Sequence, residues 1–312
     1  MRCRLTRTSA RSCAGCDSSH ARRRRRGPCT ASRTRPSRSA TPSPGISAGA
    51  LLSPPTASAS TSDNVRLVVL PDAEALAETA ATLIRDRVTA RPDLVMAVPA
   101  GRTPRRMYER LRDLQAHAPV EFSGMRVLCV DELCPPATAD GYFWSQVRRE
   151  FLSWAEVKPE HCYRFRVDAP DLDVMCREYE ETIARLGGLD LVMLGLGPNA
   201  HLASNEPGTA FDSVTRPVRL LEESVNYMAS DGPNVTACAG PLAEQAVTLG
   251  LATIARGREV VVIVSGQGKR RALERLTKGP IGLDAPATIL RNHPCCAVLA
   301  DRDAAGSAER PE

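Results

Sequence analysis

Residues 189–208 read Leu-Asp-Leu-Val-Met-Leu-Gly-Leu-Gly-Pro-Asn-Ala-His-Leu-Ala-Ser-Asn-Glu-Pro-Gly, and this stretch decides the fold of the 312-residue chain. Its first six residues form a mainly apolar run between glycines, which predicts a buried strand. The glycine-containing turn that follows presents His201 and Glu206 beyond the carboxyl end of that strand. Ligands bind at that edge in open α/β sheets, and a histidine beside a carboxylate moves protons near neutral pH. We therefore expect a catalytic loop here; the alternative is a surface loop with an ordinary histidine.

The pattern of an apolar strand followed by a polar cluster recurs along the chain. Short apolar runs predict strands at residues 65–70, 94–98, 125–130, 191–194, 260–264 and 297–299. Helical spacing predicts helices at residues 71–88, 104–114, 141–152, 171–186 and 269–276, the second of them capped by Thr103. The alternation predicts a three-layer α/β/α fold with a Rossmann-like, mainly parallel sheet. Residues 222–239 are polar and irregular, which predicts a long loop that could act as a lid.

Charge separates an amino-terminal tail from the rest of the chain. Residues 1–62 carry 12 arginines, no lysine and a single acid, Asp17. Without them, the 41 basic and 36 acidic residues become 29 and 35, so residues 63–312 have a net charge of about −6. We expect these 250 residues to form one domain that does not bind nucleic acid. No apolar run is long enough to predict a membrane-spanning helix.

The tail is rich in Arg, Ser, Thr and Pro, a composition that predicts disorder. Three interpretations compete. In the first, the tail resembles an organelle transit peptide, although it lacks an amphipathic helical pattern. In the second, the arginines at residues 22–26 bind nucleic acid or act as an import signal. We favour the third, a start codon assigned upstream of the true one.

Eleven cysteines without framework spacing indicate a reducing compartment with free thiols, and we expect a cytoplasmic protein. Cys13, Cys16, His20 and Cys29 have the residue types of a zinc site. We interpret them as a chance cluster within the tail and expect no metal.

Six segments in order resemble a known family. Residues 195–208 resemble the G-x-G-x-D-G-H-I-A-F-N-E-P-G signature of the glucosamine-6-phosphate deaminases, whose superfamily includes 6-phosphogluconolactonases and ribose-5-phosphate isomerases. Residues 99–104 resemble the family's T-G-S-T-P sugar-phosphate loop, and residues 130–133 its M-D-E-Y segment. The other matches are residues 212–216, 247–250 and 266–269.

The resemblance implies a cofactor-free enzyme that isomerises an amino-sugar phosphate and releases ammonia by hydrolysis. It implies that Asp131 moves the C2 proton with support from Glu132, and that His201 opens the sugar ring. In the family two carboxylates orient the histidine; Glu206 matches one of them, and Asn199 replaces the other. Family members commonly form homo-oligomers, so we expect one here.

The expected phosphate site has two parts. Gly101 lies between a strand and a helix N-terminus, where backbone N–H groups and the helix dipole favour an anion and Thr103 can add a hydroxyl. Lys269 opens another helix after a glycine-rich turn and supplies a cation, although a lysine there can also be merely solvated. Arg102 replaces a family serine and can bind phosphate, fill the cradle or reach another acid.

Several departures leave rival interpretations open. Besides Asn199 and Arg102, Ala200 replaces a family glycine, and Ser230-Asp231-Gly232 stand where a phosphate-binding lid arginine is expected. The chain is therefore interpreted as a glucosamine-6-phosphate deaminase-like enzyme, and the departures leave open a divergent paralogue that acts on another amino sugar or sugar phosphate. The alternatives are a 6-phosphogluconolactonase-like hydrolase and a sugar-phosphate-binding regulator without activity.

Overall fold

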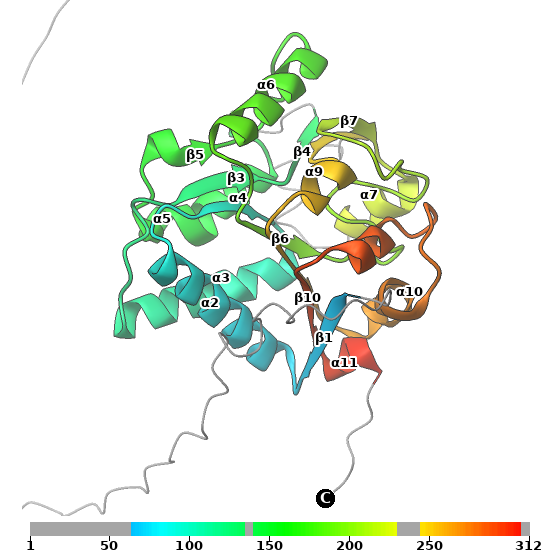
Figure 1. Cartoon of the computed structure of the whole chain (residues 1–312), viewed down its shortest axis with the longest axis horizontal. Helices are drawn as coiled ribbons and strands as arrows, with labels where there is room; N and C mark the ends of the chain where they lie inside the picture. Colours follow the sequence, from blue (N-terminus) through cyan, green and yellow to red (C-terminus); the bar gives the residue numbers. More distant parts are fainter. Residues whose placement is uncertain (1–63, 135–139, 230–243, 307–312) are drawn as a thin grey trace, which may run out of the picture. The chain divides into compact units, whose positions relative to one another are not determined.

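A parallel sheet forms the centre of the fold (Figure 1). The computed structural model describes residues 64–134, 140–229 and 244–306, so the tail at 1–62 lies outside the described residues and its boundary stays a prediction. In that described part the sheet has seven strands in the order β1-β10-β9-β6-β2-β3-β5. Their bounds are β1 Val65–Leu70, β2 Val95–Val98, β3 Arg126–Cys129, β5 Cys162–Tyr163, β6 Leu191–Gly195, β9 Glu259–Val264 and β10 Cys296–Asp301.

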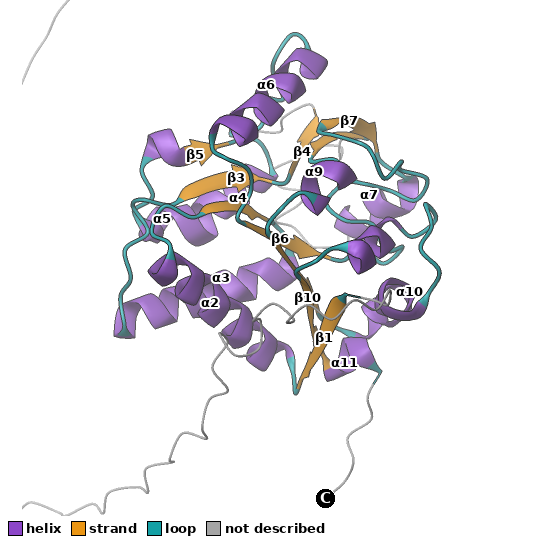
Figure 2. Ribbon diagram, viewed as in Figure 1, coloured by secondary structure: helices purple, strands orange, loops and turns teal. Residues whose placement is uncertain are grey.

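Helices cover both faces of this sheet, which confirms the three-layer α/β/α prediction (Figure 2). The right-handed crossover rule puts α2 (Ala73–Ala90) and α3 (Arg102–His117) on one face, where they pack together. It puts α6 (Leu172–Arg185) and α10 (Arg270–Lys278) on the other. The shorter helices are α4 (Phe143–Val147), which continues as a π-helix over Arg148–Leu152, α5 (Ser153–Ala155), α9 (Leu251–Ala255) and α11 (Arg302–Ala305).

A second, antiparallel sheet of β4 (Asp131–Cys134), β8 (Gln245–Thr248) and β7 (Arg216–Arg219) lies beside the first. The chain leaves the main sheet at the end of β3 and enters the small sheet at Asp131 with only Val130 between them. This sheet was not predicted from the sequence. Its effect is to place Asp131 at the junction of the two sheets.

The order of the main sheet positions a ligand site. After β2 the chain proceeds through β3 and β5 on one side, and after β6 it proceeds through β9 and β10 on the other. The neighbours β2 and β6 therefore form the switch point, and the loops after them separate to open a crevice. Residues 99–104 follow β2 and residues 196–208 follow β6.

Two local predictions were wrong. Helix α3 begins at Arg102 with Gly101 as its N-cap, at a φ of 120° that favours glycine, so Thr103 lies in the first turn and is not the cap. Residues 222–229 form the helix α7 (Glu222–Ala229) where a loop was predicted, and the rest of that segment, residues 230–239, lies outside the described residues. Within the described ranges no helix is both long and apolar enough to cross a membrane.

Candidate active site

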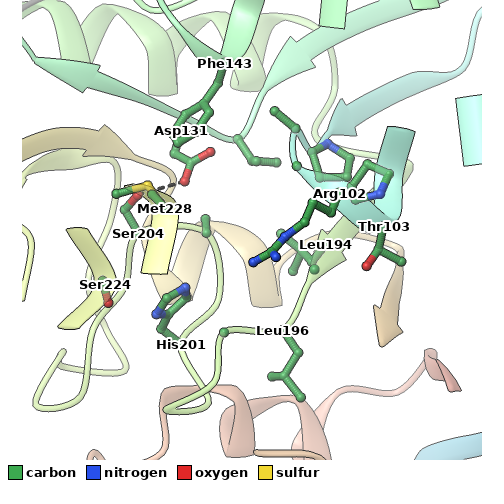
Figure 3. A pocket seen from close by; sticks show the side chains of 18 of the residues that line it. Arg102, Thr103, Asp131, Phe143, Leu194, Leu196, His201, Ser204, Ser224 and Met228 are labelled. Carbon is green, nitrogen blue, oxygen red and sulfur yellow. Dashed lines mark hydrogen bonds between the residues drawn. The ribbon is translucent and has the colours of Figure 1, made fainter. Parts of the chain in front are cut away.

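One pocket at the carboxyl ends of β2, β3 and β6 collects most of the predicted site residues. Among its lining residues are Gly101, Arg102, Thr103, Asp131, His201, Glu206 and Lys269. Asn199 lines an adjoining cavity and contacts Glu206 from there. Figure 3 shows Arg102 extended into the pocket, with Asp131, Ser204 and His201 grouped opposite it. The site therefore joins acid–base groups to cations across a single cavity.

Asp131 is the first residue of β4, where it pairs with Thr248 of β8. Its side chain is buried, and its Oδ2 accepts a hydrogen bond from Ser204 Oγ at 2.7 Å. Burial raises the pKa of Asp131 to about 6, against the opposing effect of the Ser204 bond. A carboxylate with this pKa is a stronger base than an exposed aspartate and is still ionised at neutral pH.

The neighbouring residue, Glu132, holds the start of helix α4. Its buried carboxylate accepts backbone N–H bonds from Leu133 and from the first turn of α4, at residues 142–144. A methyl group on Gly141 would overlap this carboxylate, so the turn requires glycine. Burial raises the pKa of Glu132 despite these four bonds. Glu132 thus caps α4 and stays outside the pocket lining.

Helix α4 in turn holds the loop after β2. The Gln146 side chain accepts from the Gly101 N–H at 3.2 Å and donates to the Gly101 carbonyl at 3.0 Å. The Gly101 N–H is therefore already engaged, which corrects the expectation that it is free to bind phosphate. What Gly101 contributes is the backbone turn that aims the N-terminus of α3 at the pocket.

His201 is held against the glycine turn. A methyl group on Gly197 would overlap the imidazole ring, so only glycine lets the ring lie there. Ala200 adopts a φ of 68°, the left-handed conformation that explains the glycine in the family signature at this position. The His201 Nδ1 lies 3.3 Å from Glu206 Oε2, an ion-pair distance without hydrogen-bond alignment. The ring is 19% exposed, so a ligand in the pocket can reach it.

Asn199 connects two carboxylates. Its Nδ2 donates to Glu206 Oε2 at 3.0 Å and to Glu223 Oε1 at 2.7 Å, and its Oδ1 accepts from the His201 backbone N–H at 3.2 Å. Burial alone would raise the pKa of Glu206, but contacts with His201, Ser224 and Asn199 bring it below its ordinary value. The imidazole of His201 thus contributes most to keeping Glu206 ionised, and the Ser224 hydroxyl and the Asn199 amide add to its effect.

Two cations, Arg102 and Lys269, also line the pocket. The Arg102 guanidinium lies 4.7 Å, and the Lys269 ammonium 4.4 Å, from the ring centre of Tyr227. Burial, with a smaller effect from the Arg102 charge, lowers the pKa of Lys269 to about 8. Two cations held against the same tyrosine ring, with Thr103 also on the pocket wall, suit a dianionic group such as phosphate.

Helix α7 contributes residues that the sequence analysis missed. Ser224, Tyr227 and Met228 line the pocket, and Glu223 reaches Asn199. The i, i+3 and i+4 spacing of Ser224, Tyr227 and Met228 could have indicated one helical face. Ser204 was also missed; its signal was a polar residue where the quoted signature has phenylalanine. Among the residues that the structure describes, no three His, Cys, Asp or Glu side chains are placed to hold a metal ion.

Comparison with known proteins identifies the family to which the chain belongs. Residues 72–299 match the family model of glucosamine-6-phosphate isomerases/6-phosphogluconolactonase. The chain is 32% identical to a glucosamine-6-phosphate deaminase of Bacillus velezensis over 75% of the chain and 95% of that protein. It is 32% identical to the glucosamine-6-phosphate deaminase of Rhodopirellula baltica over 79% of the chain and 97% of that protein.

Solved structures agree with this assignment. A monomeric glucosamine-6-phosphate deaminase superposes with a TM-score of 0.72 at 30% identity, over 77% of this chain and 99% of that one. The 6-phosphogluconolactonase of Trypanosoma brucei shares the fold, with a TM-score of 0.63 at 22% identity over 78% and 99% of the two chains. The chain therefore belongs to the glucosamine-6-phosphate isomerase/6-phosphogluconolactonase family.

Proposed function

We propose that the protein isomerises and deaminates an amino-sugar phosphate, releasing ammonia and a ketose phosphate. The observation that carries the proposal is the lining of the pocket, which brings the acid–base groups Asp131 and His201 into the same cavity as the cations Arg102 and Lys269. The identity to glucosamine-6-phosphate deaminases across most of the chain supports it. The departures at Asn199 and Arg102 support an amino sugar that differs from that substrate.

The reaction then proceeds in three steps. His201 gives a proton to the ring oxygen as the bond from that oxygen to C1 breaks, and the C1 hydroxyl proton passes to solvent as the open aldehyde forms. Asp131 takes the proton from C2 and returns one to C1 while a proton passes from the amino nitrogen to the C1 oxygen, so the double bond moves and an imine remains at C2. Water adds to C2, and ammonia departs with the bonding electrons of the carbon–nitrogen bond. The paired cations hold the phosphate throughout.

Substituting Asp131 by asparagine tests the proposal, because the amide keeps the shape of the side chain and removes the base. We expect Asp131→Asn to bind inorganic phosphate as the wild type does and to lose about 10²–10⁴-fold in turnover. Deuterium incorporation from solvent at C2 is the direct readout. Asp173→Asn, at an exposed position on α6, is the matched control. Exchange at the wild-type rate in Asp131→Asn would rule out the assigned role.

A substrate panel separates this proposal from its rivals. Ammonia release from amino-sugar phosphates supports a deaminase, whereas hydrolysis of a sugar-phosphate lactone without ammonia supports the lactonase alternative. Binding without either reaction supports a regulator. The lactonase structures below 25% identity share the fold and carry no further argument for that activity.

We also propose that the protein works in the cytoplasm as a homo-oligomer. The cysteines that the structure describes are free thiols, which supports a reducing compartment. Light scattering tests the oligomeric state, and a monomer, the state of the related solved deaminase, is the contrary result.

A further inference from the structure

Ser204 occupies an unusual position for a residue outside the expected catalytic set. It stands where the quoted family signature has phenylalanine, and it is only 6% exposed. Its Oγ donates to Oδ2 of Asp131 at 2.7 Å (Figure 3). The two residues are 73 positions apart, so the contact depends on the assembled fold.

The backbone around Ser204 is held in place beside Asp131. Its N–H donates to Thr248 Oγ1 at 3.1 Å, and Thr248 is the partner of Asp131 across the β4–β8 pairing. Ala203, the preceding residue, has a φ of 50°, and Asn205 closes the turn by donating its N–H to the Leu202 carbonyl at 2.9 Å. A left-handed residue followed by a closed turn holds the Ser204 backbone, so its side chain starts next to the Asp131 carboxylate.

We propose that Ser204 is a positioning residue for the base, anchoring Oδ2 of Asp131 so that Oδ1 remains in the pocket to receive the substrate proton. The proposal rests on the proposed function. Within the described residues Oδ1 accepts no hydrogen bond, while Asp131 lines the pocket. A carboxylate tethered through one oxygen keeps a single orientation toward the substrate, and orientation is a major part of proton-transfer rates.

The anchor also acts on the charge of the base. Burial and the adjacent Glu132 favour the protonated form of Asp131, whereas the Ser204 bond and the charge of His201 favour the ionised form. The Cys129 thiol donates to the Asp131 backbone carbonyl and leaves the carboxylate untouched. Removing the hydroxyl should therefore raise the pKa of Asp131 above its value of about 6.

The test is the pH profile of kcat/KM for Ser204→Ala on an amino-sugar phosphate that the wild type turns over. Asp131 must be ionised to act, so activity is lost as the pH falls through its pKa. We expect that loss to begin about one pH unit higher in Ser204→Ala, as for the loss of one bond to a charged group. Activity should fall about tenfold at pH 8.5 with KM unchanged, and about fivefold further at pH 6.

Matched variants separate positioning from general damage. Ser204→Cys, a weaker donor of similar shape, should give an intermediate shift and keeps the test open if Ser204→Ala folds poorly. Ser265→Ala removes a different serine of the pocket lining, whose hydroxyl donates to Asp301. Its acid limb, the fall in activity on the acid side of the pH profile, should stay at the wild-type pH. An acid limb at the wild-type pH in both Ser204 variants overturns the proposal.

A measurement without substrate distinguishes this inference from the proposed function. Titration of the Asp131 carboxyl carbon by NMR in the ligand-free protein should show the same upward shift in Ser204→Ala. If the wild type neither releases ammonia nor exchanges the C2 proton, the proposed function fails while this titration still decides whether Ser204 anchors the carboxylate. An unchanged titration overturns the anchor itself.

Discussion

Replacing Asn199 by aspartate should destabilise the protein, and a second substitution, Glu223→Gln, should recover part of the loss. In the wild type the amide group of Asn199 donates one hydrogen to each of two carboxylates, Glu206 and Glu223. Aspartate has no hydrogen to donate at neutral pH, so the single variant would bring three carboxylates together. In the double variant, the new amide at position 223 can donate to the new carboxylate at position 199, which restores one of the two bonds.

The magnitude follows from the burial of each bond. The bond to the buried Glu206 contributes about 1.5–3 kcal/mol, as is typical for a charged acceptor. The bond to the exposed Glu223 contributes at most about 1 kcal/mol because solvent screens it. Asn199→Asp should therefore cost roughly 2–4 kcal/mol, a fall in Tm of about 5–10 °C for a domain of this size. Glu223→Gln should return about 2–4 °C of that fall.

The pH dependence has a definite sign. The repulsion in Asn199→Asp exists only while the carboxylates are ionised, and close pairs of carboxylates retain a proton to higher pH than isolated ones. The stability difference from the wild type should therefore be largest at pH 8 and shrink as the pH falls toward 5.

Thermal unfolding of the four members of the cycle measures the coupling. Glu222→Gln, which removes the same charge from the neighbouring exposed residue of α7, is the matched control and should not rescue Asn199→Asp. Equal recovery from Glu222→Gln would show that net charge alone is responsible. An Asn199→Asp protein as stable as the wild type at pH 8 would refute the bridging role of the amide.

Three further predictions follow from the composition and the site. Deleting residues 1–62, whose composition predicts disorder, should leave Tm and activity unchanged, and a large loss of either would contradict that interpretation. Because Lys269 has a pKa of about 8, the affinity of the wild type for inorganic phosphate should fall above pH 8. The affinity of Lys269→Arg should stay constant up to about pH 9.5, because arginine keeps its charge. Calorimetry at several pH values measures both affinities, and the same pH dependence in both proteins would exclude Lys269 as the titrating group. Gly197→Ala should displace the His201 ring and lower kcat by about 100-fold with phosphate binding intact, so a fully active variant would place His201 outside the reaction.

The sequence predicted the main sheet because its strands are buried apolar runs with regular helices between them. It did not predict the small sheet, since a strand such as Arg216–Arg219 has four residues, one of them proline, and no clear alternation. Helix α7 was missed for a similar reason, because its eight residues are mostly polar outside the face that meets the pocket.

The candidate site was also predictable only in part, for the same reason. Asp131, His201, Glu206 and the phosphate loop lie next to strands whose carboxyl ends are predictable, and the fold brings them together; their individual roles remain predictions. The Ser204–Asp131 and Asn199–Glu223 contacts join residues 73 and 24 positions apart and leave no periodic trace in the sequence. Only the assembled tertiary structure reveals them.

The adjacency of Asp131 and Glu132 restricts how this part of the chain can change in length. Successive residues of a strand point to opposite faces, so Asp131 faces the pocket while Glu132 faces away from it and holds the first turn of α4. Inserting or deleting one residue between β3 and β4 would shift the register and reverse both directions at once. The Asp131 carboxylate would leave the pocket, and α4 would lose the Glu132 carboxylate that caps its first turn. A substitution of Asp131 or of Glu132 removes either the base or the helix cap, whereas a single-residue insertion or deletion removes both.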